Sequence, residues 1–252
     1  MKHLKLVSQE SLPFADAFDA LRAYVEQRQD HGSVTQFDST EAAPWPRMKK
    51  DGIVLKNDMA VELGSPQYAS TSYLVWTQHQ GQVQDGLTTL IGPDLAQASE
   101  ANLSFGKVVL LEVDGFDEAN CRERHRELEL LRLGLHLSGY MLRAASQEGR
   151  EWSRVSKEAL STGFSLATLG NALIELYRSV KYVKAVEVLF VTSSKDDVGD
   201  LRSIGAKAKR QLETMPQPEG ELELEDCDSC EYTDICDEVD GLKQMRHSHT
   251  GG

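Results

Sequence analysis

The sequence predicts an α/β fold, a mixed sheet flanked by helices, with an N-terminal helical extension and an acidic, cysteine-rich C-terminal tail. Apolar runs with strand character alternate with amphipathic segments of helical period, which is typical of α/β architecture. The runs 107–113 and 185–193 are largely apolar without alternation, as expected of strands covered on both faces. With 252 residues, 40% of them hydrophobic, the chain is long enough to bury a substantial core.

The N-terminal part, residues 1–50, is predicted to be one helix and a connector. The segment 14–28 places apolar side chains three and four residues apart, as on one face of a helix. These side chains are Phe14, Phe18, Leu21 and Val25. The following segment, 31–52, is rich in turn-forming residues and holds two prolines, so we expect a connector there.

The central part, residues 51–216, is predicted to hold the α/β domain. Strands are expected at 59–63, 71–76, 87–91, 107–113 and 185–193. Helices are expected at 117–147, 153–160, 165–180 and 195–214. In the first of these helices, Leu128, Leu131, Leu135 and Leu142 are expected to form one apolar stripe.

Composition narrows the classes of function. The formal net charge of −13 opposes binding to a phosphate backbone or to an anionic membrane, so we expect neither nucleic acid nor membrane as a partner. No run of eighteen apolar residues occurs, and the first residues lack the apolar stretch of a secretory signal, which predicts a cytoplasmic protein.

The tail, residues 217–252, combines acid with closely spaced thiols. Cys227, Cys230 and Cys236 form a C-x2-C-x5-C pattern inside the segment 219–240, which holds eleven Asp or Glu and no Lys or Arg. The acidic composition alone would predict a solvated, disordered tail. Clustered thiols in a reducing compartment, however, favour a metal site over disulfides. A closed site needs a fourth ligand, for which Cys121 is the remaining cysteine. The alternatives to it are three histidines, His125, His247 and His249.

Spacing alone leaves the metal open, because both zinc and iron–sulfur sites use C-x2-C pairs. The tail resembles the arrangement that holds a [4Fe–4S] cluster in a class of iron–sulfur nucleases, and this resemblance is confined to the tail. It favours a [4Fe–4S] cluster over zinc or a metal-free tail.

The segment "GREWSRVSKEAL" groups an aromatic ring with basic side chains. Arg150, Trp152, Arg154 and Lys157 lie within eight residues, and Arg143 lies upstream near the end of the predicted long helix. Such a group could stack an adenine ring on the indole and pair phosphates with guanidinium groups. The alternative is an amphipathic helix whose tryptophan is part of the core and whose basic residues are solvated.

Several motifs in one order give a more specific indication. Between residues 52 and 214 the following motifs succeed one another: "KNDMAVELGSP", "DGLTTLIGPDL", "WSRVSKEAL" followed by "GFS", and "VKAVEVLFVT". In order and spacing the chain resembles the middle domain of the acetyl-CoA synthase subunit of CO dehydrogenase/acetyl-CoA synthase. The resemblance implies an α/β domain that is associated with coenzyme A. It carries over directly to Trp152 and Arg154, and less directly to Arg143 and Arg150.

The departures from that family are informative as well. The chain has no Cys-Gly-Cys nickel site and ends sixteen residues after Cys236, so we do not expect a complete acetyl-CoA synthase. We expect instead an accessory, electron-transfer iron–sulfur protein of anaerobic one-carbon metabolism. Its expected partner is a CO dehydrogenase, a corrinoid protein or a related enzyme, and a homo-oligomer is also considered. The alternatives are a coenzyme A- or acyl-binding subunit of an acyltransferase and a zinc-stabilised binding module.

Overall fold

The computed structural model describes residues 14–29, 34–39, 60–97, 102–135, 137–145 and 149–214, all within the compact unit Met1–Pro216. Its helices are α1 (Ala15–Gln29), α2 (Cys121–Gly134), α3 (Lys157–Ser161), α4 (Leu166–Arg178) and α5 (Lys195–Thr214), with a 3-10 helix η3 (Leu95–Gln97). Its strands are β1 (Val34–Asp38), β2 (Ala60–Leu63), β3 (Ser70–Thr77), β4 (Leu87–Ile91), β5 (Asn102–Leu103), β6 (Phe105–Val113), β7 (Met141–Ala145), β8 (Glu151–Ser156) and β9 (Val183–Val191). The predicted α/β class is confirmed.

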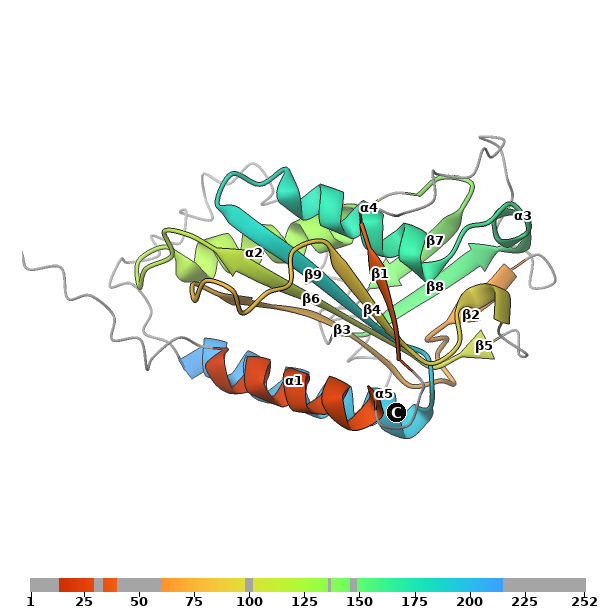
Figure 1. The fold of residues 1–252 in the computed structure, drawn as a ribbon, viewed down its shortest axis with the longest axis horizontal. Helices are drawn as coiled ribbons and strands as arrows, with labels where there is room; N and C mark the ends of the chain where they lie inside the picture. Colours follow the sequence, from red (N-terminus) through yellow and green to blue (C-terminus); the bar gives the residue numbers. More distant parts are fainter. Residues whose placement is uncertain are drawn as a thin grey trace, which may run out of the picture. The chain divides into compact units, whose positions relative to one another are not determined.

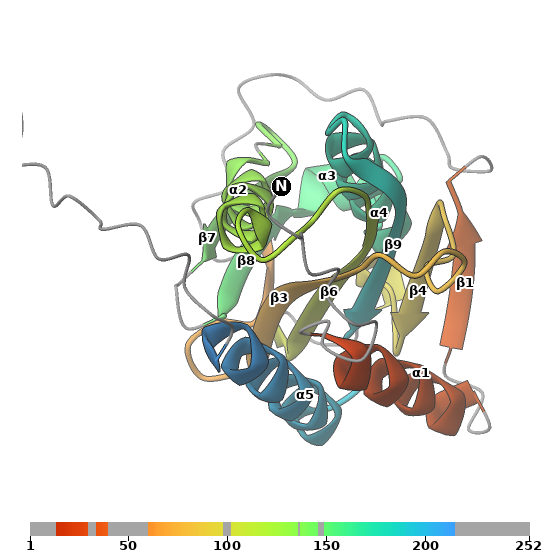
Figure 2. The same cartoon turned by 90° about the vertical axis from the view of Figure 1, so that its left-hand side faces the viewer.

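The larger sheet has five strands in the order β1-β4-β9-β6-β3. Two of its pairings are parallel and two antiparallel, so the sheet is mixed, as predicted. The apolar strands β6 and β9 lie at its centre and are buried over almost their whole length. Figures 1 and 2 show α1 and α5 on one side of this sheet and α2 and α4 on the other, which explains why both central strands lack polar alternation.

The smaller sheet has four strands in the order β5-β2-β8-β7. It joins the larger sheet where β8 passes β3, and Gly64 permits the close approach. This glycine has a φ of +63°, and a Cβ atom built on it would lie 2.5 Å from the carbonyl oxygen of Glu151 in β8 and 2.8 Å from Cβ of Ser70 in β3. A side chain at this position would push the two sheets apart.

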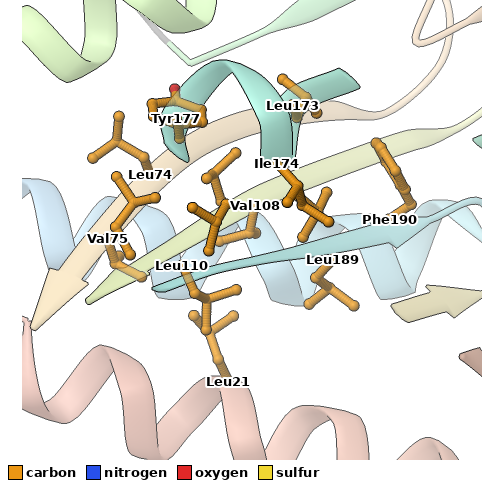
Figure 3. Packing of buried hydrophobic residues seen from close by; sticks show 14 of the residues in the cluster. Leu21, Leu74, Val75, Val108, Leu110, Leu173, Ile174, Tyr177, Leu189 and Phe190 are labelled. Atoms are coloured by element: carbon orange, nitrogen blue, oxygen red, sulfur yellow. The ribbon is translucent and has the colours of Figure 1, made fainter. Parts of the chain in front are cut away.

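The core fills both sides of the larger sheet. Figure 3 shows Leu21 of α1 beside Leu110 on one side, and side chains of α4 on the other. The α4 side chains are Leu173, Ile174 and Tyr177. Because the apolar stripe of α1 packs into this cluster, the predicted first helix is confirmed together with the face that it buries.

The predicted connector contains a strand. Residues 34–38 form β1, which pairs antiparallel with β4 at the edge of the larger sheet. The run "VTQFD" is short, lacks polar–apolar alternation and stands among turn-forming residues, so its strand conformation depends on the hydrogen bonds that β4 provides.

The predicted long helix 117–147 is wrong in its second half. Helix α2 ends at Gly134, and a turn follows in which Gly139 has a φ of +84°. The chain then enters strand β7, where Leu142 is 43% exposed instead of continuing an apolar stripe. The leucine spacing in this segment fits a helical period, but pairing of β7 with β8 decides its conformation.

The predicted helix 153–160 is wrong in its first half for the same reason. Residues 151–156 form β8, which is hydrogen-bonded to β2 on one side and to β7 on the other. The helix begins only at Lys157, where the Ser156 side chain caps it by accepting a hydrogen bond from the backbone N–H of Ala159. The remaining predicted strands and helices are confirmed within a few residues.

Among the described residues, no helix is both long enough and apolar enough to cross a membrane.

Candidate functional site

Strand β8 sorts the predicted binding residues onto two faces of the smaller sheet. Side chains alternate along a strand, so Trp152 and Arg154 share one face. In register with Arg154 lie Glu62 of β2 and Leu142 of β7, and Ala144 lies opposite Trp152. We call these five residues the outer face.

The outer face has a carboxylate at its centre. The indole Nε1–H of Trp152 donates a hydrogen bond to Glu62 Oε2 at 3.2 Å. Arg154 Nε forms an ion pair with Glu62 Oε1 at 3.4 Å, and the two side chains are only 15% and 17% exposed. Trp152 and Arg154 are therefore brought together by the fold, and both are held by the same acidic side chain.

Arg150 and Lys157 flank the outer face at the two ends of β8. The Arg150 guanidinium donates hydrogen bonds to the carbonyl oxygens of Tyr68, at 3.3 Å, and Pro66, at 3.5 Å, in the loop after β2. Lys157 is the first residue of α3 and is exposed. Arg150 thus supports a loop, whereas Lys157 offers its charge to solvent beside the outer face.

Arg143 lies on the opposite face of the sheet from Trp152. Its Nε donates a hydrogen bond to Glu151 Oε1 at 2.8 Å, and its two terminal nitrogens donate to the carbonyl oxygens of Leu135 and Arg132. The guanidinium therefore stabilises the C-terminal end of α2, where backbone carbonyls lack helical partners. The sequence groups Arg143 with Trp152 by charge and nearness along the chain, and strand alternation places them on opposite faces.

A buried ionic group, which we call the inner cluster, joins the two sheets and α2. It consists of Ser72, Lys107, Arg132, Arg143 and Glu151. Lys107 and Glu151 form an ion pair and are 1% and 0% exposed. Ser72 Oγ donates to Glu151 Oε2 at 2.9 Å and accepts from Arg132 Nη1 at 2.6 Å. The cluster thereby connects β3 and β6 of one sheet to β7 and β8 of the other.

Within the inner cluster, burial and the charge of the ion-pair partner shift the pKa in opposite directions, for Lys107 and for Glu151 alike. Burial lowers the pKa of the Lys107 ammonium to about 7, against the attraction of Glu151. Burial alone would raise the pKa of the Glu151 carboxyl, but the charges of Lys107 and Arg143 hold that pKa well below its usual range. Glu151 is therefore a buried, ionised anchor for β8, the strand that presents Trp152.

Sequence reasoning missed the inner cluster, although a signal was present. Lys107 opens the apolar run "KVVLLEV", and Glu151 occupies an inward position of the alternating segment "EWSRVS". Charged residues at inward positions of strands are buried only when they are paired, so two of opposite sign indicate mutual contact. The helical interpretation of residues 153–160 hid that alternation.

Cys121 is the first residue of α2, and its surroundings do not favour a thiolate. The side chain is 2% exposed, and Sγ lies 4.0 Å from the carbonyl oxygen of Glu118. Burial raises the pKa of the thiol, and this effect outweighs the lowering by backbone N–H groups at the start of the helix. One turn later, the ring of His125 packs against Phe14 at 5.7 Å between centroids.

The predicted tail ligands, Cys227, Cys230 and Cys236, lie outside the described residues, as do the alternatives His247 and His249. Within the described ranges, no three His, Cys, Asp or Glu side chains are grouped closely enough to hold a metal ion. Cys121 and His125 therefore have no third ligand in that part of the chain.

A depression of about 440 Å³ lies at the N-terminal end of α5. Its lining mixes both signs of charge, with Lys195 and Arg202 beside Asp196 and Asp200. None of the predicted site residues lines it.

Comparison with known proteins relates most of the described fold to one family. Residues 47–198 match the family CdhC, described as the CO dehydrogenase/acetyl-CoA synthase complex beta subunit. The acetyl-CoA decarbonylase/synthase complex subunit beta of Methanothermobacter thermautotrophicus is 28% identical over 171 residues, which are 68% of this chain and 35% of that protein. The subunit of the same name from Archaeoglobus fulgidus is 28% identical over 141 residues, 55% of this chain and 26% of that protein.

These relatives are much longer than the matched region. The chain spans about a third of one relative and about a quarter of the other. The family match contains both the outer face and the inner cluster, and it ends before the tail cysteines.

Proposed function

Because this chain belongs to the family of CO dehydrogenase/acetyl-CoA synthase complex beta subunits, we propose that it is an accessory iron–sulfur protein of anaerobic one-carbon metabolism. In this proposal the tail binds a [4Fe–4S] cluster, and the protein docks to a CO dehydrogenase, a corrinoid protein or a related enzyme. The observation that carries the proposal is the succession of a family domain, residues 47–198, and a C-x2-C-x5-C tail.

The donor chemistry of the tail fits such a cluster. Three thiolates from Cys227, Cys230 and Cys236 supply soft, anionic ligands, and thiolates bind both iron–sulfur clusters and zinc. A bound [4Fe–4S] cluster would supply one-electron redox chemistry. Cys121 fits poorly as the fourth ligand, because its thiol is buried and its raised pKa disfavours the thiolate. We therefore place the fourth ligand elsewhere, on a tail histidine or on a partner.

The net charge of −13 bears on docking. A protein with this excess of acid is steered toward a basic surface patch of its partner, and the rate of such an encounter falls as salt screens the charges. Binding to a CO dehydrogenase or corrinoid protein should therefore be faster at low ionic strength.

Anaerobic purification followed by iron, sulfide, zinc and nickel analysis tests the proposal. About four iron and four sulfide per chain are expected for a complete cluster, and these should be lost in Cys227→Ser or Cys230→Ser. Cys121→Ser is the matched control and should retain its iron. One zinc per chain without sulfide would establish the zinc alternative, and a metal-free protein would refute both.

A second candidate function, binding of coenzyme A, is favoured by the outer face. Trp152 offers an aromatic ring to an adenine, and Arg154, two residues along the same strand, offers a guanidinium to a phosphate. Isothermal titration with coenzyme A should give saturable binding that Arg154→Ala abolishes. Arg178→Ala, which removes the same charge from an exposed pair with Asp85, is the control and should bind normally. An unchanged affinity in Arg154→Ala would exclude this face as the site.

A further inference from the structure

Glu62 lies against the two polar groups of the outer face that an anionic ligand would need, accepting a hydrogen bond from Trp152 and forming an ion pair with Arg154. Its two carboxylate oxygens contact different partners, Oε1 the guanidinium of Arg154 and Oε2 the indole N–H of Trp152. Each is a group that recognises phosphate or a polar edge of a base. The carboxylate therefore stands where a ligand phosphate would have to bind.

We propose that Glu62 is a specificity residue that acts as a latch: its carboxylate holds Trp152 and Arg154 in the free protein and must be displaced by an anionic ligand. The inference rests on the second candidate function, coenzyme A binding at the outer face. It adds a residue that weakens binding and selects among ligands by their charge.

Electrostatics gives the direction of the effect. Arg154 and Glu62 carry opposite charges in contact and are both largely buried, so their fields nearly cancel at an approaching phosphate. A phosphate gains the attraction of Arg154 only after the carboxylate has moved, and it is repelled by that carboxylate while it remains nearby. A neutral ligand that stacks on Trp152 meets no such repulsion.

The strand register makes the latch a fixed feature of the fold. Glu62 and Arg154 are direct partners in the antiparallel pair of β2 and β8, where facing side chains lie close together. On the other side of β8, Glu151 is anchored in the inner cluster, which fixes the register of the strand. Displacement of the carboxylate therefore requires a change of the Glu62 rotamer, not a shift of either strand.

Glu62→Gln tests the latch, because the amide keeps the shape of the side chain and an acceptor for Trp152 while removing the charge. Titration calorimetry with coenzyme A at low salt should show roughly tenfold tighter binding than wild type, with the gain shrinking as salt is added. Adenosine, which is uncharged, should bind both proteins equally. Glu175→Gln, an exposed carboxylate on α4, is the charge-matched control and should leave affinity unchanged.

A second variant, Glu62→Met, has a side chain of similar length without charge or acceptor and should also bind coenzyme A more tightly than wild type. Thermal unfolding of both variants verifies that they fold. If wild type binds coenzyme A and both variants bind equally or more weakly, Glu62 positions Arg154 and the latch is refuted while the binding function stands. If neither wild type nor folded variants bind coenzyme A, the binding function and the latch both fail.

Discussion

Replacing Glu151 by glutamine removes the carboxylate charge that Lys107 and Arg143 share inside the protein. The glutamine has nearly the same shape but only one acceptor oxygen, so it can keep the hydrogen bond from Arg143 or the one from Ser72, but not both. Glu151 and Lys107 are 0% and 1% exposed, which means that water cannot replace the lost charge without opening the junction of the two sheets.

The magnitude follows from the charges involved. Two unit charges about 4 Å apart attract by about 4 kcal/mol at an effective dielectric constant of about 20. Glu151 makes two such contacts, with Lys107 and with Arg143, but deprotonation of Lys107 offsets part of the loss because its pKa already lies at about 7. Breaking a buried pair by removal of one partner typically costs about 3–5 kcal/mol, and we expect a loss of that size.

Urea unfolding followed by circular dichroism at neutral pH measures this loss. Glu213→Gln provides the control, because Glu213 pairs with Lys209 on the surface of α5, where both side chains are more than 60% exposed. That change should alter the free energy of unfolding by less than about 0.5 kcal/mol. A cost below about 1 kcal/mol for Glu151→Gln would refute the reasoning, since it would mean that the inner cluster is hydrated in solution.

Three further predictions follow from particular contacts. Folding lowers the pKa of Lys107 from the usual value of about 10.4 to about 7, so the folded state loses this proton first and the free energy of unfolding rises between pH 7 and 10. The urea midpoint should therefore rise more from pH 7 to pH 9 in wild type than in Lys107→Met. An equal change of the midpoint in the two proteins would contradict this prediction. Gly170→Ala should lower the free energy of unfolding by about 1–3 kcal/mol, because the new methyl group would lie 2.3 Å from the Thr88 hydroxyl oxygen as α4 packs on β4; an unchanged thermal midpoint would show that the helix can shift freely. In a variant whose three tail cysteines are serine, Cys121 should react with a thiol reagent slowly in the folded protein and rapidly in denaturant, because burial shields its thiol and raises its pKa; fast labelling without denaturant would be inconsistent with that burial.

Much of the fold could be predicted from the sequence, because long elements with consistent patterns depend little on context. The amphipathic segment that forms α1 and the apolar runs of β6 and β9 are examples. The errors fall on residues 34–38, where turn-forming neighbours suggested a connector, and on residues 135–156, where leucine spacing and basic residues suggested helix. Strands β7 and β8 form within this second segment because they are hydrogen-bonded to each other, and β8 is also hydrogen-bonded to β2, which is distant in the sequence.

The candidate site was predicted only in part for the same reason. Trp152 and Arg154 could be selected from the sequence as an aromatic ring beside a cation. Their shared partner Glu62 lies about ninety residues away and is connected to them only by strand pairing. Arg143 was selected for its charge, and the structure pairs that charge with Glu151 on the other face.

The sequence by itself determined the α/β class, the family relationship and the presence of three closely spaced thiols in the tail, because these depend on local periodicity, motif order and residue type. Tertiary structure alone decided which charges meet. Pairing of β2 with β8 brings Glu62 to Arg154, and the packing of two sheets brings Lys107 to Glu151. The physical reason is that the energy of a charge depends on its distance from other charges and from water, and only the folded chain fixes those distances.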